Sequence, residues 1–218
     1  MRHWQRSVQQ TYDLVAGEYA ARIFDELAGK PFDRAILDRF GELARPLGPV
    51  CDLGCGPGQV ARYLAERGLE TVGIDLSPGM IAEARRLNPG LRFEQGAMLA
   101  LDFADGELGG IAAFYSIVNV PRDEQSLAFT EAWRVLRPGG WLLVAFHIGE
   151  GDVHLDEWWE TPVSIDFLFF QPAEIEERLV AAGFILEESH VRQPYPDVEH
   201  PSQRAYLLAR KPTRSPLS

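Results

Sequence analysis

The stretch Val50-Cys-Asp-Leu-Gly-Cys-Gly-Pro-Gly-Gln59 determines the fold class of this chain. It begins with a short run typical of a buried strand and continues into three alternating glycines, Gly54, Gly56 and Gly58, before a helical pattern. Glycine allows a sharp backbone turn and lets a ligand approach a main chain that carries no Cβ. A strand, a glycine turn and a helix in this order predict a nucleotide-binding α/β unit.

Short apolar runs alternate with helix-period segments on the C-terminal side of this stretch, which predicts a parallel sheet covered by helices. We expect strands near 50–53, 70–75, 91–94, 110–116 and 140–147, and a closing pair at 184–191 and 205–209. On the N-terminal side, a capping-box pattern at Ser7 and a helix start at Pro31 predict two leading helices. The sequence thus predicts a single domain over 1–212, with helices in 1–47 above the ligand site, a core in 48–212 and a frayed tail at 213–218.

A second candidate ligand contact lies at the end of the second predicted strand. Asp75 there has the position of an acidic residue that accepts hydrogen bonds from both hydroxyls of a ribose. The alternative is that Asp75 or Ser77 only caps the helix beginning at Pro78, and Ser77 is the better cap. We therefore predict ribose binding by Asp75.

Five segments together resemble the class I S-adenosylmethionine-dependent methyltransferases that act on small molecules. They are the glycine block at 50–59, Asp75 with Met80, the turn at 96–98, the fourth strand at 111–118 and the block 133–140. The resemblance implies an α/β, three-layer Rossmann-like fold with a seven-stranded sheet ordered 3-2-1-4-5-7-6, whose last strand is antiparallel. It also implies in-line transfer of a methyl group from S-adenosylmethionine to a small-molecule acceptor, where alignment supplies most of the catalysis.

The resemblance also assigns cofactor-binding residues. Asp52 and Gly54 would contact the methionine end, Gly56 and Gly58 would allow close backbone approach, and Asp75 would bind the ribose. The adenine would lie between apolar side chains, although core packing is an alternative for Met80, and Ala97 stands where relatives often carry an acid. The remaining assignments are Leu76, Met80 and Met98 at the adenine, Tyr115 and Ser116 beneath the sulfonium, and Tyr19 on the helix above the donor.

The acceptor side is expected in the segment from His147 to Trp159, which follows the fifth predicted strand. We predict a proton acceptor at His147, with His154 and Tyr115 as alternates, because imidazole titrates near neutral pH. The alternative is a surface loop anchored by tryptophans. The loop with Arg192, Tyr195, Glu199 and His200 is a second candidate wall, and no metal site is expected.

Composition limits the partners. The formal net charge of −11 opposes binding to a nucleic-acid backbone, which depends on Lys and Arg. No apolar run approaches the length needed to span a bilayer, so no membrane partner and a cytoplasmic location are expected. Cys51 and Cys55 match no common metal or redox spacing and are expected to be buried packing residues. The oligomeric state is expected to be a monomer or a homodimer.

Two other functions fit part of the pattern. An NAD-dependent oxidoreductase also uses a glycine turn and a ribose-binding acid, but its spacing would need a third glycine where this chain has Gln59. A non-catalytic domain that binds S-adenosylmethionine is the other alternative, because the acid usually found at Ala97 is missing.

Overall fold

The computed structural model describes residues 1–196 and 198–213, so most of the predicted tail, 214–218, lies outside the described residues. The strands are β1 (Val50–Leu53), β2 (Thr71–Asp75), β3 (Arg92–Gln95), β4 (Leu108–Phe114), β5 (Leu136–Ile148), β6 (Asp152–Trp158), β7 (Thr161–Leu168), β8 (Ile185–Arg192) and β9 (Gln203–Arg210). The helices are α1 (His3–Ile23), α2 (Pro31–Ala44), α3 (Gln59–Glu66), α4 (Pro78–Leu87), α5 (Gln125–Val135) and α6 (Pro172–Ala181), with short 3-10 turns at Glu26–Gly29, Arg45–Leu47 and Ile117–Asn119.

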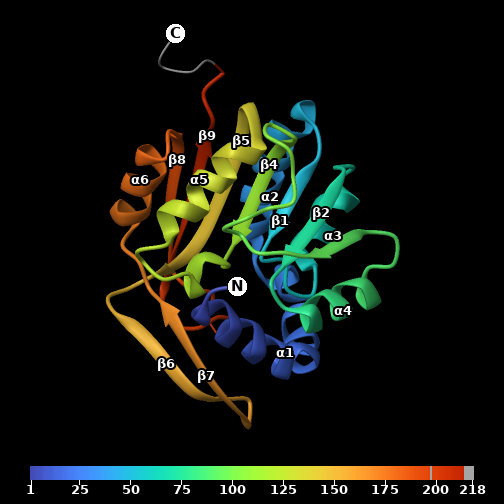
Figure 1. Ribbon diagram of the computed structural model, residues 1–218, viewed down its shortest axis with the longest axis vertical. Helices are drawn as coiled ribbons and strands as arrows, with labels where there is room; N and C mark the ends of the chain where they lie inside the picture. The colour runs from blue at the N-terminus through green and yellow to red at the C-terminus, as the bar shows by residue number, and fades with distance from the viewer. Residues whose placement is uncertain (197, 214–218) are drawn as a thin grey trace.

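Seven strands form one sheet in the order β3-β2-β1-β4-β5-β9-β8 (Figure 1). Strands β1 to β5 pair in parallel, whereas β9 is antiparallel to both β5 and β8. The last strand of the chain therefore lies antiparallel between the fifth strand and β8, as the resemblance implies.

The two faces of β5 explain the three layers. Leu142, Val144 and Phe146 pack in one cluster with α5 and α6, whereas Leu143 and Ala145 pack with α2 and α3 on the opposite face. Side chains alternate between the faces of a strand, so a run that is apolar throughout must be covered on both sides. The predicted three-layer core is confirmed.

Two details differ from the sequence-based predictions. The capping box predicted at Ser7 is wrong: α1 begins at His3, and the backbone N–H of Arg2 donates to Gln5 Oε1 over 2.8 Å. The segment after the fifth strand also forms more regular structure than expected, because β6 and β7 pair as an antiparallel hairpin outside the main sheet. Figure 1 shows this hairpin extending beside α1.

No helix among residues 1–196 and 198–213 combines the length and the apolar character that a membrane crossing requires. Cys51 and Cys55 are buried and free, as expected for packing residues.

Candidate functional site

A pocket that is partly open to solvent lies where β1, β2 and β4 end and α1 crosses above them. In an open α/β sheet the carboxyl ends of the strands form the ligand crevice. Of the predicted site residues, the pocket wall contains Tyr19, Gly54, Gly56, Asp75, Leu76, Met80, Ala97, Met98, Tyr115 and Ser116. Asp52, Gly58, His147 and His154 are not among its lining residues.

Gly54 and Gly56 form the floor of the pocket and have positive φ values of 74° and 51°. A Cβ on Gly54 would lie 2.3 Å from the Cβ of Ser116, and a Cβ on Gly56 would lie 3.7 Å from Tyr19 Cε1. Gly58 also has a positive φ, 85°, but a Cβ there would meet the Phe93 ring at 2.7 Å, away from the pocket. The first two glycines thus shape the pocket, whereas Gly58 allows the turn to pack against the protein interior.

Asp75 is held against the pocket wall by main-chain donors. Its carboxylate accepts the backbone N–H groups of Gly56 and Ser77, each over 2.9 Å. Burial raises the pKa of Asp75, while these two hydrogen bonds oppose the rise. Ser77 caps α4 by accepting Met80 N–H over 3.0 Å, so capping does not occupy Asp75.

Asp52 has a different environment from Asp75. It is 1% exposed, and its carboxylate accepts Ala61 N–H in α3 over 2.8 Å. Burial raises the pKa of Asp52 to about 7, although the hydrogen bond from Ala61 lowers it. These contacts tie β1 to α3, and the predicted contact of Asp52 with the methionine end stays a prediction.

Helix α1 covers the pocket with residues spaced four or seven apart, which lie on one face of a helix. Trp4, Val8, Tyr12 and Tyr19 all line it, and the Tyr12 hydroxyl donates to Asn119 Oδ1 over 2.9 Å. The helix start predicted at Ser7 left Trp4 outside the helix, so the contact of Trp4 with the pocket was not predicted. Burial raises the pKa of Tyr12 and Tyr19 above the usual tyrosine range.

The β6–β7 hairpin adds an aromatic side chain to this cover. Trp158 meets the rings of Tyr12 and Tyr19 edge-on, with centroid distances of 5.6 and 5.7 Å. The hydroxyls of Ser7 and Thr11 in α1 donate to the Ser164 carbonyl of β7 over 3.2 and 3.5 Å. The predicted segment 147–159 therefore reaches the pocket cover through its tryptophan, although Trp158 does not line the pocket itself.

His154 lies on the exposed side of this hairpin. Its ring pairs with Asp166 at 2.6 Å and with Asp156 at 3.2 Å, and these partners raise its pKa. No group of three or more metal-ligating side chains occurs in the part of the chain that the structure describes. The structure thus does not bring His154 to the pocket.

Tyr115 and His147 lie side by side at the ends of β4 and β5, with ring centroids 5.1 Å apart. Tyr115 lines the pocket with φ 56°, and its hydroxyl lies 2.7 Å from that of Tyr206. His147 Nδ1 lies 2.9 Å from Ser202 Oγ. Burial, reinforced by the charge of Arg204, lowers the pKa of His147 to about 3. Its imidazole is therefore neutral at physiological pH.

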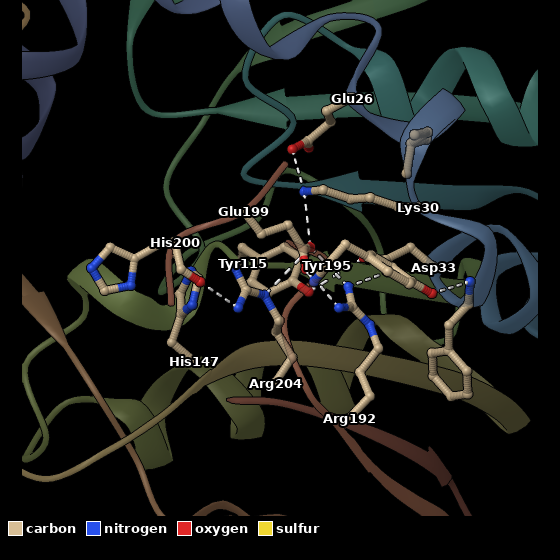
Figure 2. Close-up of polar contacts among 12 residues, drawn as sticks. Glu26, Lys30, Asp33, Tyr115, His147, Arg192, Tyr195, Glu199, His200 and Arg204 are labelled. Carbon is tan, nitrogen blue, oxygen red and sulfur yellow. Dashed lines mark hydrogen bonds and ion pairs between the residues drawn. The ribbon is translucent and has the colours of Figure 1, made fainter. Parts of the chain in front are cut away.

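The loop between β8 and β9 brings buried charges beside Tyr115 and His147, although Arg192, Tyr195, Glu199 and His200 do not line the pocket (Figure 2). Glu199 is 1% exposed at its side chain and pairs with Arg192 at 2.6 Å and with Lys30 at 3.4 Å. Arg192 also pairs with Asp33, whose side chain is fully buried. The second predicted wall thus lies beside Tyr115, with its charges paired to α2 and to the turn before it.

Comparisons with known proteins agree with this geometry. Residues 50–140 match the methyltransferase domain family. The chain is 41% identical over 112 residues to the demethylmenaquinone methyltransferase of Beutenbergia cavernae, covering 51% of this chain and 45% of that protein. It is 35% identical over 97 residues to the malonyl-[acyl-carrier protein] O-methyltransferase of Enterobacter lignolyticus, covering 44% and 38%. The matched region thus spans less than half the length of these relatives.

The similarity extends further in a solved structure. The complex of DhpI with SAH matches 98% of this chain and 100% of that one, with a TM-score of 0.74 and 25% identity. The domain match over residues 50–140, the sheet order and the pocket built on the glycine turn together support assignment to the class I S-adenosylmethionine-dependent methyltransferases.

Proposed function

We propose that this protein transfers a methyl group from S-adenosylmethionine to a small-molecule acceptor. The observation that carries the proposal is the Asp75 carboxylate, held by two backbone N–H groups in a pocket wall that Gly54 and Gly56 leave open. Such a wall fits a ribose between an adenine and an amino-acid tail. S-adenosylmethionine, when bound, supplies a methyl group already activated by a sulfonium.

The residues that line the pocket fit the ribose and the adenine of that donor. Asp75 would accept from the ribose hydroxyls, and Leu76, Met80 and Met98 provide apolar surface for the adenine. Met80 is 1% exposed and still lines the pocket, so core packing and adenine contact are compatible. Ala97 lines the pocket without offering a carboxylate to the adenine amino group.

A small acceptor agrees with the charge and with the aromatic cover. The net charge of −11 disfavours a nucleic acid, and Tyr12, Tyr19 and Tyr115 give the pocket large, weakly polar surfaces. The names of two relatives, a demethylmenaquinone methyltransferase and a malonyl-[acyl-carrier protein] O-methyltransferase, support a small organic group as the acceptor. Of the three predicted catalytic residues, Tyr115 lines the pocket, whereas His147 and His154 do not. Because neither predicted imidazole base lines the pocket, we propose that enclosure and alignment of the reactants supply most of the rate enhancement.

Calorimetry with S-adenosylmethionine, S-adenosylhomocysteine and NAD tests donor binding. We expect the first two to bind at micromolar levels and NAD to show no binding, since Gln59 replaces the third glycine of the dinucleotide pattern. Mass spectrometry with isotopically labelled donor then tests methyl transfer to candidate acceptors, with and without EDTA. Binding of NAD alone would support the oxidoreductase, and donor binding without transfer to any acceptor would support a non-catalytic domain.

A further inference from the structure

Gln59 is a pocket residue to which the sequence pattern assigned no role. It is the first residue of α3, 9% exposed, and it lines the pocket. Its Nε2 donates to Glu26 Oε1 over 3.2 Å. Because an ionised carboxylate only accepts hydrogen bonds, the amide nitrogen must face Glu26 and the carbonyl oxygen must point elsewhere. That oxygen, Oε1, is enclosed and has no partner among the described residues.

Glu26 is itself fixed by the buried charges shown in Figure 2. Lys30 pairs with Glu26 and lies 3.4 Å from Glu199 Oε1, and the Lys30 side chain is 8% exposed. Glu199 is in turn held by Arg192 and by the backbone N–H of Tyr195, over 2.8 Å. Glu26 therefore has little freedom to release the amide of Gln59, and the orientation of Gln59 is set by the fold.

The sheet order places Gln59 at a definite end of the pocket. Lys30, the partner of Glu26, lies 5.7 Å from the centroid of the Tyr115 ring, at the end of β4. Leu76 and Met98 follow β2 and β3, on the other side of β1. A donor with its adenine beside Leu76 and Met98 would direct its amino-acid tail toward β4 and Gln59.

We propose that Gln59 Oε1 accepts a hydrogen bond from the α-ammonium group of the donor, and that Glu26 is the positioning residue that aims it. This inference rests on the proposed donor binding. The ammonium is a group that only donates, and an unpartnered buried carbonyl oxygen is the matching acceptor. Binding would thus supply the partner that Gln59 Oε1 lacks.

Calorimetry with S-adenosylhomocysteine and with its analogue lacking the α-amino group tests the contact without requiring turnover. The wild-type protein should bind S-adenosylhomocysteine at least about 10-fold more tightly than the analogue, the scale of a hydrogen bond to a charged group. Gln59→Met keeps the length of the side chain and removes its polar atoms. It should weaken S-adenosylhomocysteine about 10-fold and change the affinity for the analogue by less than about twofold.

Glu26 variants test the positioning role. Glu26→Ala should reduce the preference for the amino group several-fold, whereas Glu26→Gln keeps an accepting oxygen and should preserve most of it. Asn88→Ala is the matched control: Asn88 is also a buried amide with an unpartnered carbonyl oxygen, and it does not line the pocket. Its discrimination between the two ligands should equal that of the wild type.

Two outcomes would overturn the inference. In the first, Gln59→Met binds S-adenosylhomocysteine and its analogue as tightly as the wild type does. In the second, Gln59→Met loses the same affinity for both ligands, which would indicate that Gln59 has only a structural role. A wild-type protein that binds neither ligand contradicts the proposed function instead. Thermal unfolding of each variant shows whether it is folded under the conditions of the titration.

Discussion

The donor side and the acceptor side that we propose for the pocket are built in different ways. The donor side uses the glycine turn, Asp75 and the turn at 96–98, which follow neighbouring parallel strands within one stretch of sequence. The proposed acceptor side combines α1 with two elements that do not line the pocket, the β6–β7 hairpin and the β8–β9 loop, and all three are far apart in the chain. The shape of the donor side depends mainly on main-chain geometry, whereas the shape of the acceptor side depends mainly on contacts between side chains that are distant in sequence. The donor can therefore be identified from local sequence, whereas the acceptor cannot.

Gly54→Ala should cause the largest loss of donor affinity. Its Cβ would lie 2.3 Å from Ser116 Cβ, and φ at this position is 74°, a conformation that costs any L-residue free energy. We expect affinity for S-adenosylhomocysteine, measured by calorimetry, to fall about 100-fold or more. Gly68→Ala is the control, because Gly68 has φ 81° but no atom within 4 Å of the added Cβ. That variant should lose about 1 kcal/mol of stability and retain donor affinity; equal binding losses in both would assign the effect to backbone strain alone.

Asp75→Ala should have the next largest effect, again on the donor side. Loss of its carboxylate removes the acceptor for the ribose hydroxyls and leaves the N–H groups of Gly56 and Ser77 without their partner. The expected loss of donor affinity is about 1.5 to 3 kcal/mol, the range for hydrogen bonds to a charged group. Unchanged affinity in calorimetry would remove Asp75 from the donor site.

The same contrast explains which features could be predicted from sequence. The strand and glycine turn at 50–59 and the acid at Asp75 follow local rules of backbone conformation, so their places in the fold could be predicted. The hairpin was missed because its two-residue turn consists of Trp159 and Glu160, with φ of 51° and 62°, where such turns favour Asn-Gly. Gln59 was missed because its orientation depends on Glu26, 33 residues away in the chain.

Trp158→Ala should affect the acceptor more than the donor, because Trp158 contacts Tyr12 and Tyr19 of α1 and does not line the pocket. Removing its ring takes one edge contact from each of Tyr12 and Tyr19, which still meet each other edge-on, and so loosens the cover of the pocket. We expect the KM of the acceptor to rise about 5- to 10-fold, since aromatic pairs contribute about 0.5–1.5 kcal/mol each. Donor affinity should fall less than this, because Tyr19 keeps its own place in the pocket wall. Val153→Ala, at an exposed hairpin position, is the control and should change neither quantity; a loss of donor affinity in Trp158→Ala as large as the change in KM would show that the hairpin serves both sides.

His147→Gln should have the smallest effect, although position alone predicts a proton acceptor there. A general base works best with a pKa near the working pH, and burial lowers the pKa of His147 to about 3. The ring also contacts Ser202, Tyr115 and Phe169 and does not line the pocket, which favours a packing role. Turnover at saturating acceptor should therefore stay within about threefold of wild type between pH 6 and 9, against the roughly 100-fold loss expected for a positioned base.

The stability of the same variant provides a second readout. Because the pKa of His147 is lower in the folded state than its usual 6.5, the unfolded chain binds more protons between about pH 3 and 6.5, and stability falls as pH falls through that range. His147→Gln removes this dependence, so the unfolding midpoint of the wild type should drop more steeply between pH 6.5 and 4 than that of the variant. A 100-fold loss of turnover with unchanged donor affinity would instead restore His147 as the base and require the ring to reach the pocket during the reaction.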